Sequence, residues 1–133
     1  MKKTYRGSCK CDRVKFEADI DFATAETHKC NCTSCWKSRW WSVKVKPDAF
    51  RSVAGERELS KYVPGKSGGF CKHCGVTPYS YVPAAEWNSG EEFSVSVAAL
   101  DDLEPAELLA ATVKFYDGKA DNWWHQPAEV RHL

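Results

Sequence analysis

The sequence predicts a small domain that is mainly β, with many short strands and short connections. Residues 14–18 and 93–98 alternate apolar and polar side chains at a period of two, which is the pattern of half-buried strands. Helical composition is confined to residues 105–111, where a proline precedes Ala, Leu and Glu. A chain of 133 residues that is 43% hydrophobic can bury a core of its own, so we expect a single domain over residues 1–133.

Strands are expected, in chain order, at residues 4–8, 14–18, 39–46, 50–54, 59–63, 78–82, 93–98 and 112–116. The first two would form a hairpin with Cys9 and Cys11 at its tip. Loops or turns are expected at residues 19–27 (with a short strand), 30–35, 64–69 and 117–118. The domain would therefore contain at most one short helix.

Charge and hydropathy argue against two classes of partner. The 19 basic and 18 acidic residues give a net charge of +1, without the basic surplus that binding to nucleic acid usually requires. No apolar run approaches the roughly 20 residues of a membrane helix, and the first residues lack the apolar segment of a secretory signal. We therefore expect neither nucleic acid nor a membrane as partner, and a cytoplasmic protein whose thiols are reduced or bound to metal.

The seven cysteines fall into three short groups, which are Cys9 with Cys11, Cys30 with Cys32 and Cys35, and Cys71 with Cys74. A metal ion gathers thiols in short loops, because the metal–sulfur bonds are only about 2.3 Å long. Disulfides would spread the cysteines singly, since close neighbours in sequence are poorly placed to bridge each other. Free buried thiols are the other alternative, and tight grouping of all seven argues against them.

Cys71 and Cys74, followed by Gly75, have the spacing of a zinc knuckle and supply two of four ligands. Cys9 and Cys11 form the pair that is left to complete this site if the other three cysteines act alone.

The group of Cys30, Cys32 and Cys35 is where we expect chemistry. Three cysteines leave one position of a tetrahedral metal open for water or substrate. Alternatively a histidine closes the site, and the candidates are His28, His73, His125 and His132. An iron–sulfur cluster is a third possibility, although the spacings do not match the usual ferredoxin runs. Three thiolates on a divalent cation leave a net charge of −1, which favours binding of a soft thiolate over activation of water.

The three groups together resemble the glutathione-dependent formaldehyde-activating enzyme (GFA) family. The matching features are Gly7-x-Cys9-x-Cys11, Cys30-x-Cys32-x2-Cys35, Phe70-Cys71-x2-Cys74-Gly75 and a tryptophan pair near residue 123. The resemblance implies an Mss4-like β-tent of small antiparallel sheets around zinc. It also implies two zinc ions per chain. The structural zinc would be held by Cys9, Cys11, Cys71 and Cys74. The catalytic zinc would be held by Cys30, Cys32 and Cys35.

The family's founding activity is the addition of glutathione to formaldehyde, formally a carbon–sulfur lyase reaction. We therefore expect a zinc-dependent enzyme of this type, in which a metal-bound thiolate adds a glutathione-like small thiol to formaldehyde or a related small aldehyde. The alternative is a noncatalytic, zinc-stabilised Mss4-like binding module. A zinc-ribbon nucleic-acid binder is a third hypothesis, which the charge balance disfavours.

Basic and aromatic residues near the three-cysteine group are candidates for holding glutathione, which carries two carboxylates. They are Lys29, Lys37, Arg39 and Lys44, with Trp36, Trp40 and Trp41. The alternative is a solvated basic surface without a specific ligand. For Trp123 and Trp124 we expect packing in the core or in a lid, with stacking on a ligand as the alternative.

Overall fold

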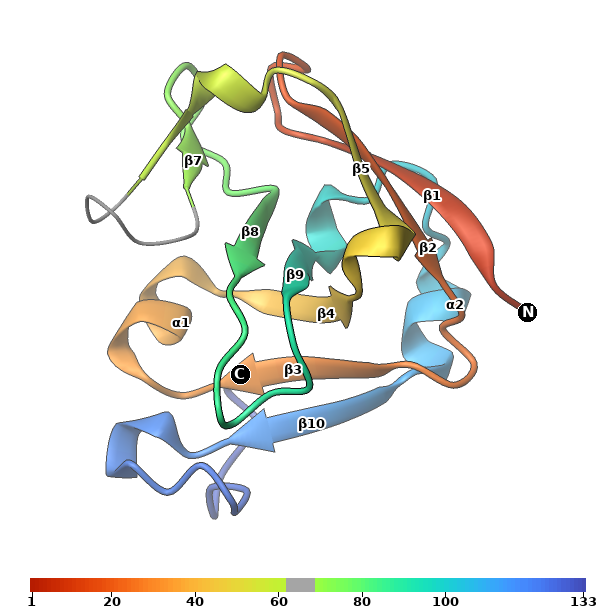
Figure 1. Cartoon of the computed structure of the whole chain (residues 1–133). Helices are drawn as coiled ribbons and strands as arrows, with labels where there is room; N and C mark the ends of the chain where they lie inside the picture. The colour runs from red at the N-terminus through yellow and green to blue at the C-terminus, as the bar shows by residue number, and fades with distance from the viewer. Residues whose placement is uncertain (62–68) are drawn as a thin grey trace.

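The structure, a computed structural model, describes residues 1–61 and 69–133, which form three β-sheets and two short α-helices (Figure 1). The predicted mainly β architecture of small sheets is therefore confirmed. Most of the loop expected at 64–69, and the last two residues of the strand expected at 59–63, lie outside the described residues.

The first sheet has the strand order β1-β2-β5 and is antiparallel throughout. Its strands are β1 (Lys3–Ser8), β2 (Lys15–Ile20) and β5 (Phe50–Ala54). The hairpin expected between the first two strands is confirmed. Strand β2 runs two residues past the predicted end, because the alternation continues and buries Ala18 and Ile20.

The second sheet has the strand order β10-β3-β4-β9-β8. Its strands are β10 (Thr112–Tyr116), β3 (Glu26–Cys30), β4 (Trp41–Val45), β9 (Glu92–Ser96) and β8 (Tyr79–Val82). Strand β10 runs parallel to β3, whereas the other pairs are antiparallel as expected. The parallel pair places Tyr116 beside Cys30, so the chain that follows β10 begins next to the three-cysteine group.

The third sheet is a two-stranded pair of β6 (Leu59–Ser60) and β7 (Phe70–Cys71). Its register pairs Leu59 with Cys71. This pair and the tip of the β1–β2 hairpin lie together at one end of the molecule (Figure 1).

Helix α2 (Pro105–Ala110) is the helix predicted from sequence, and it ends one residue early. Helix α1 (Thr33–Ser38) is a correction, because residues 30–35 were expected to form a loop and only one helix was expected. Short 3₁₀ turns also follow β4, β5, β9 and β10, namely η1 (Pro47–Ala49), η2 (Glu56–Glu58), η3 (Val97–Ala99) and η4 (Gly118–Ala120). Among the described residues, no helix is long and apolar enough to cross a membrane.

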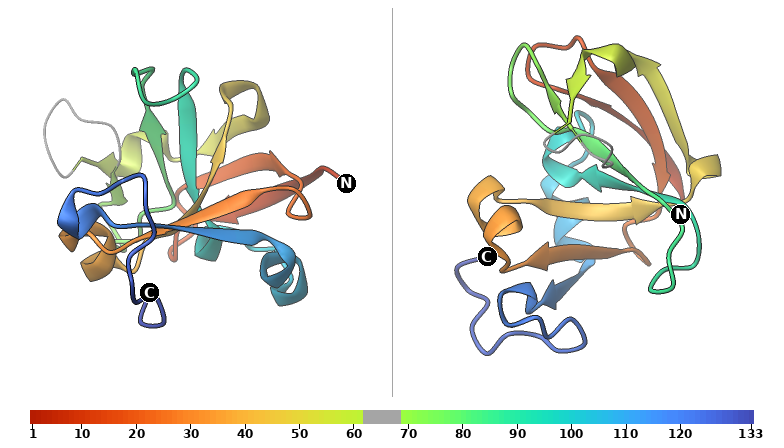
Figure 2. Two further views of the ribbon diagram at one scale, coloured as in Figure 1. Left: turned by 90° about the horizontal axis from the view of Figure 1, so that it is seen from below. Right: turned by 60° about the vertical axis from the view of Figure 1, so that its left-hand side comes forward.

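The core lies between the two larger sheets and contains an aromatic cluster from both. The ring of Phe50 in β5 stacks on Phe93 in β9 at 4.0 Å between centroids, and Phe16 in β2 meets Tyr79 in β8 edge-on at 5.3 Å. Strands β3 and β10 end, and the antiparallel strand β4 begins, at one side of the molecule, where α1 connects β3 to β4 (Figures 1 and 2). The chain beyond β10 returns to the same side and ends near α1 (Figures 1 and 2).

Candidate metal centres and the adjoining pocket

The four-cysteine cluster (Cys9, Cys11, Cys71 and Cys74) joins the tip of the β1–β2 hairpin to the turn after β7. All four Sγ atoms lie within 4.8 Å of one another. The chain can make both turns because Asp12 and Gly75 adopt positive φ values of 65° and 81°. Two loops that are distant in sequence therefore present four thiols to one point.

The spacing and charge of this cluster fit a tetrahedral metal ion. Cys11 Sγ lies 3.6 Å from both Cys9 Sγ and Cys71 Sγ, close to the roughly 3.8 Å expected between sulfurs around one zinc ion. This distance is much too long for a disulfide bond. Burial raises the pKa of Cys9 to about 11, whereas hydrogen bonds from the backbone and side chain of Arg13 lower the pKa of Cys11 to about 6. Arg13 thus offsets part of the negative charge that four thiolates would bring.

The three-cysteine cluster (Cys30, Cys32 and Cys35) is built by the end of β3 and the start of α1. Its Sγ atoms also lie within 4.8 Å of one another. Cys32 is the N-cap of α1 and accepts a hydrogen bond from the backbone N–H of Cys35 at 3.4 Å. The Sγ of Cys30 accepts one from the N–H of Cys32, also at 3.4 Å. These amide-to-sulfur bonds hold the three thiols on one side of a single helical turn, a donor set that fits a soft metal ion.

The pKa values of the three thiols are shifted in different directions. Burial raises the pKa of Cys35. Burial also raises the pKa of Cys30, against hydrogen bonds from the backbone N–H groups of Cys32 and Gly118. The pKa of Cys32 is lowered although burial acts to raise it, because the N–H of Cys35 donates to its sulfur. The cluster thus combines one thiol that ionises readily with two that favour the neutral form without a cation.

In the described part of the chain, no histidine or carboxylate completes the three-cysteine cluster. The four candidate histidines make other contacts, although Nδ1 of His28 is buried without a hydrogen-bond partner in that part of the chain. His28 stacks on Tyr116 and His132 meets Trp36, while His73 pairs with Glu58 and His125 with Asn122. The interpretation in which a histidine closes the site is therefore not supported by the described residues.

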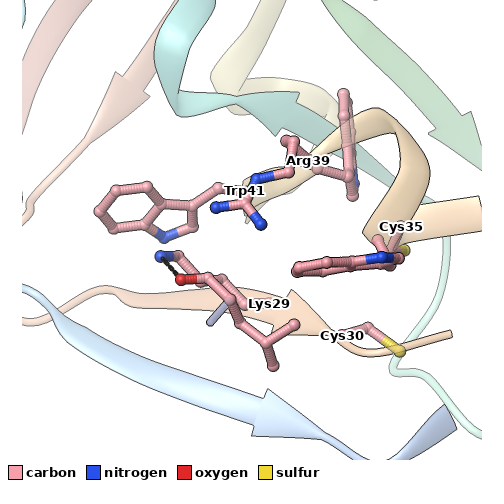
Figure 3. A pocket seen from close by; sticks show the side chains of 8 residues that line it. Lys29, Cys30, Cys35, Arg39 and Trp41 are labelled. Atoms are coloured by element: carbon pink, nitrogen blue, oxygen red, sulfur yellow. Dashed lines mark hydrogen bonds between the residues drawn. The ribbon is translucent and has the colours of Figure 1, made fainter. Parts of the chain in front are cut away.

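A pocket of about 130 Å³ adjoins the three-cysteine cluster (Figure 3). Its lining consists of Lys29, Cys30, Cys35, Trp36, Arg39, Trp40, Trp41 and Leu133. The Nζ of Lys29 lies 4.1 Å from the centre of the Trp41 ring, and the guanidinium of Arg39 lies 4.8 Å from that of Trp36. Two cations held over indole rings therefore stand beside two of the three thiols.

The C-terminal residues lie against these two cations. Lys29 Nζ donates to the backbone oxygen of Leu133 at 3.1 Å, which is drawn as a dashed line in Figure 3. A guanidinium nitrogen of Arg39 donates to the backbone oxygen of His132 at 2.8 Å. Both acceptors are backbone oxygens, so the two cations already bind oxygen ligands at the pocket.

Comparison with protein families matches residues 4–118 to the family model of the glutathione-dependent formaldehyde-activating enzyme, GFA. The chain belongs to this family. A crystal structure of a Rhodobacter sphaeroides protein is similar to the GFA-family protein described here, with a TM-score of 0.62 and 26% sequence identity over 82% of this chain and 99% of that one. No curated protein matches the chain.

The basic residues expected around the three-cysteine cluster of this GFA-family protein separate into two sets. Lys29 and Arg39 line the pocket together with all three expected tryptophans. Lys37 is not among the lining residues, and Lys44 instead pairs with Glu92 at 3.5 Å. Trp124 does not pack in the core as expected, because the residue is 85% exposed. Trp123 is 45% exposed and packs against Gly118.

Sequence analysis missed Asn31, Asp117, Gly118 and the C-terminal residues as parts of this region. Asn31 and Asp117 are 86 positions apart and form a side-chain hydrogen bond of 2.8 Å. The Asp-Gly turn was a local signal for a bend after the last strand, but no local pattern indicates that the bend lies beside Cys30.

Proposed function

We propose that this GFA-family protein is a zinc-dependent enzyme of carbon–sulfur lyase type, which adds a glutathione-like small thiol to formaldehyde or a related small aldehyde. In this proposal it holds two zinc ions per chain. The four-cysteine cluster holds a structural ion and the three-cysteine cluster a catalytic one. The observation that carries the proposal is the three-cysteine cluster, which has no fourth ligand among the described residues and opens beside a pocket with two cations.

The chemistry of the donor set supports a thiol substrate. A zinc ion held by Cys30, Cys32 and Cys35 would supply a soft centre with one open position, which favours a thiol and lowers its pKa. In the net reaction the carbon–oxygen π bond of the aldehyde breaks, a sulfur–carbon bond forms, and the thiol proton ends on the aldehyde oxygen. No carboxylate or histidine is among the pocket's lining residues, so the described pocket supports no side-chain base of those types for the thiol.

The pocket residues would orient the thiol. Arg39 and Lys29 can each bind a carboxylate in place of a backbone oxygen, and the charged acceptor makes the stronger hydrogen bond. The indole faces of Trp36 and Trp41 lie under these cations and would exclude water from one side of the bound peptide. A glutathione molecule anchored by its carboxylates would then have its sulfur directed toward Cys30 and Cys35.

The test combines metal analysis with a direct assay of the addition reaction. We expect about two zinc ions per chain, on the four-plus-three ligand count. We also expect faster formation of S-hydroxymethylglutathione than in buffer, measured by magnetisation exchange in NMR. In the cobalt-substituted protein, glutathione should change the thiolate-to-metal charge-transfer band and S-methylglutathione should not.

Zinc only at the four-cysteine cluster, or no response to any thiol, would contradict the proposal. Either result would favour the noncatalytic, zinc-stabilised binding module.

A further inference from the structure

Asn31 lies between two residues of the three-cysteine cluster and ties that cluster to the turn after β10. Its Nδ2 donates to Asp117 Oδ1 at 2.8 Å, and its Oδ1 accepts from the backbone N–H of Lys119 at 2.9 Å. Its own backbone N–H donates to the carbonyl oxygen of Tyr116 at 3.3 Å, in line with the parallel β3–β10 pairing. An amide is suited to this position because it donates to a carboxylate and accepts from an N–H at the same time.

Gly118, between the two residues that Asn31 holds, is in contact with Cys30. Hydrogen bonding from its backbone N–H acts to lower the pKa of Cys30. A Cβ added at Gly118 would lie 2.7 Å from Cys30 Sγ and 2.6 Å from the ring of Trp123. Trp123 is fixed within the same turn, because its Nε1 donates to Asp121 Oδ1 at 2.7 Å. The turn therefore presents a backbone donor and an indole ring to the three-cysteine cluster.

From these contacts we propose that Asn31 is a positioning residue of the three-cysteine cluster: by binding Asp117 and Lys119, it holds the Gly118 N–H and the Trp123 ring against Cys30. The proposal rests on the metal site proposed above. A sulfur that accepts an N–H bond is fixed in direction and loses part of its negative charge. Without the Asn31 side chain, the turn keeps the backbone pairing of β10 with β3. It loses the hydrogen bonds that join Asn31 to Asp117 and Lys119, which fix the position of Gly118.

The test begins with Asn31→Asp, which keeps the acceptor for Lys119 and places a second carboxylate against Asp117. Affinity of the three-cysteine cluster for cobalt should fall about tenfold, the size typical for loss of a partner behind a metal ligand. The charge-transfer band of this cluster should change, and the band of the four-cysteine cluster should not. In the metal-free protein the Gly118 amide should exchange its hydrogen about tenfold faster or more, because its position against Cys30 is no longer fixed.

A second substitution restores the hydrogen bond between positions 31 and 117 with donor and acceptor exchanged. In the Asn31→Asp, Asp117→Asn double variant, the amide at 117 donates to the carboxylate at 31, which still accepts from Lys119. Cobalt affinity, spectrum and Gly118 exchange should return to within about twofold of the parent, since the same number of hydrogen bonds is made at the same net charge. If Asn31→Asp does not fold, Asp117→Ala removes the same hydrogen bond without adding a charge and should give the same faster exchange at Gly118.

The matched control is Asn88→Asp. Asn88 ties another loop together, since its Oδ1 accepts from the N–H groups of Ala85 and Gly90 and its Nδ2 donates to the carbonyl of Pro83. No cysteine takes part in those bonds, so this variant should bind cobalt as the parent does.

Parent-like cobalt affinity and Gly118 exchange in Asn31→Asp would overturn the inference, as would a double variant no better than the single one. A parent protein whose three-cysteine cluster binds no metal would overturn the proposed function instead. The exchange of Gly118 in the metal-free protein distinguishes the two failures.

Discussion

Arg39 combines two local properties that matter at the pocket. It ends helix α1 in the left-handed conformation, with φ of 53°, and its backbone N–H caps the carbonyl groups of Cys35 and Trp36. This conformation turns the chain so that the guanidinium reaches back over the ring of Trp36 and the pocket. The residue that ends the helix therefore also supplies one of the two cations that line the pocket.

Replacing Arg39 with Ala should weaken glutathione binding about tenfold, because one charge-assisted hydrogen bond at an exposed site is lost. S-methylglutathione, followed by tryptophan fluorescence, should lose affinity by the same factor, since carboxylate recognition does not involve sulfur. Lys37→Ala is the matched control, because Lys37 lies on the same helix and does not line the pocket. Equal affinity in the parent and Arg39→Ala would remove Arg39 from the binding site.

Gly118 is the second residue whose local geometry matters, because it leaves room for Cys30 of the three-cysteine cluster. Gly118→Ala should release metal from the three-cysteine cluster, because the new Cβ would collide with Cys30 Sγ and Trp123 at under 3 Å. Metal analysis should then give about half the zinc of the parent, on the four-plus-three ligand count. Lys119→Ala keeps its backbone N–H bond to Asn31 and should keep both ions. A full zinc complement in Gly118→Ala would show that the turn can move away without consequence.

At the scale of elements, the C-terminal segment occupies the two cations of the pocket, so a ligand that binds those cations would have to displace it. Backbone oxygens of residues 130–133 accept hydrogen bonds from the side chains of Arg39 in the α1 cap and Lys29 in β3. In the proposed function, substrate carboxylates would contact the same two side chains. Two hydrogen bonds at a partly exposed site hold the segment only weakly, at about 1 kcal/mol each.

A chain shortened to end at Val130 should therefore bind S-methylglutathione about fivefold more tightly, the factor that corresponds to one net hydrogen bond. The measurement is a fluorescence titration at fixed ionic strength. Val130→Ala, which keeps both backbone acceptors and does not alter a residue that lines the pocket, should bind as the parent does. Weaker binding by the shortened chain would mean that the segment forms part of the ligand site.

At the scale of the whole molecule, the two clusters differ in the length of the chain segment that a bound metal would close into a loop. The four-cysteine cluster joins two pairs of cysteines that are at least 60 positions apart, and a cross-link over such a loop stabilises a fold by about 4 kcal/mol in the chain-entropy model. The three-cysteine cluster spans six residues within one turn and closes almost no chain. Loss of metal from the first should therefore affect folding far more than loss from the second.

Cys71→Ser should remove zinc and cooperative unfolding together, because metal binding and folding are coupled at the four-cysteine cluster. Cys32→Ala should keep a sharp thermal transition while losing about half the zinc, since it empties only the three-cysteine cluster. The measurements are calorimetry and metal analysis on the same preparations. A cooperative transition with an unchanged midpoint in Cys71→Ser, or collapse of Cys32→Ala, would contradict separate structural and catalytic roles.

The sequence by itself determined the strands and the grouping of the thiols. Residues 112–116 match β10, because Val113 and Phe115 alternate with polar neighbours, which is a local property of the chain. Residues 50–54 match β5, because turn residues at Pro47 and Gly55 bound the segment on both sides. The cysteines are grouped in sequence as they are in space, because ligands of one metal within a group must lie a few residues apart. Pro105 at the first turn marked α2 in the same local way.

Tertiary structure decided what surrounds those thiols. Helix α1 has no favourable composition and buries none of its residues. Its N-terminus is instead capped by the sulfur of Cys32, an arrangement that spacing alone does not predict. The parallel pairing of β10 with β3, and the contacts of Asn31 with Asp117 and of Lys29 with Leu133, join residues 86 and 104 positions apart. Such contacts leave no periodic signal in the chain, because each joins two segments that are distant in sequence and meet only in the folded domain.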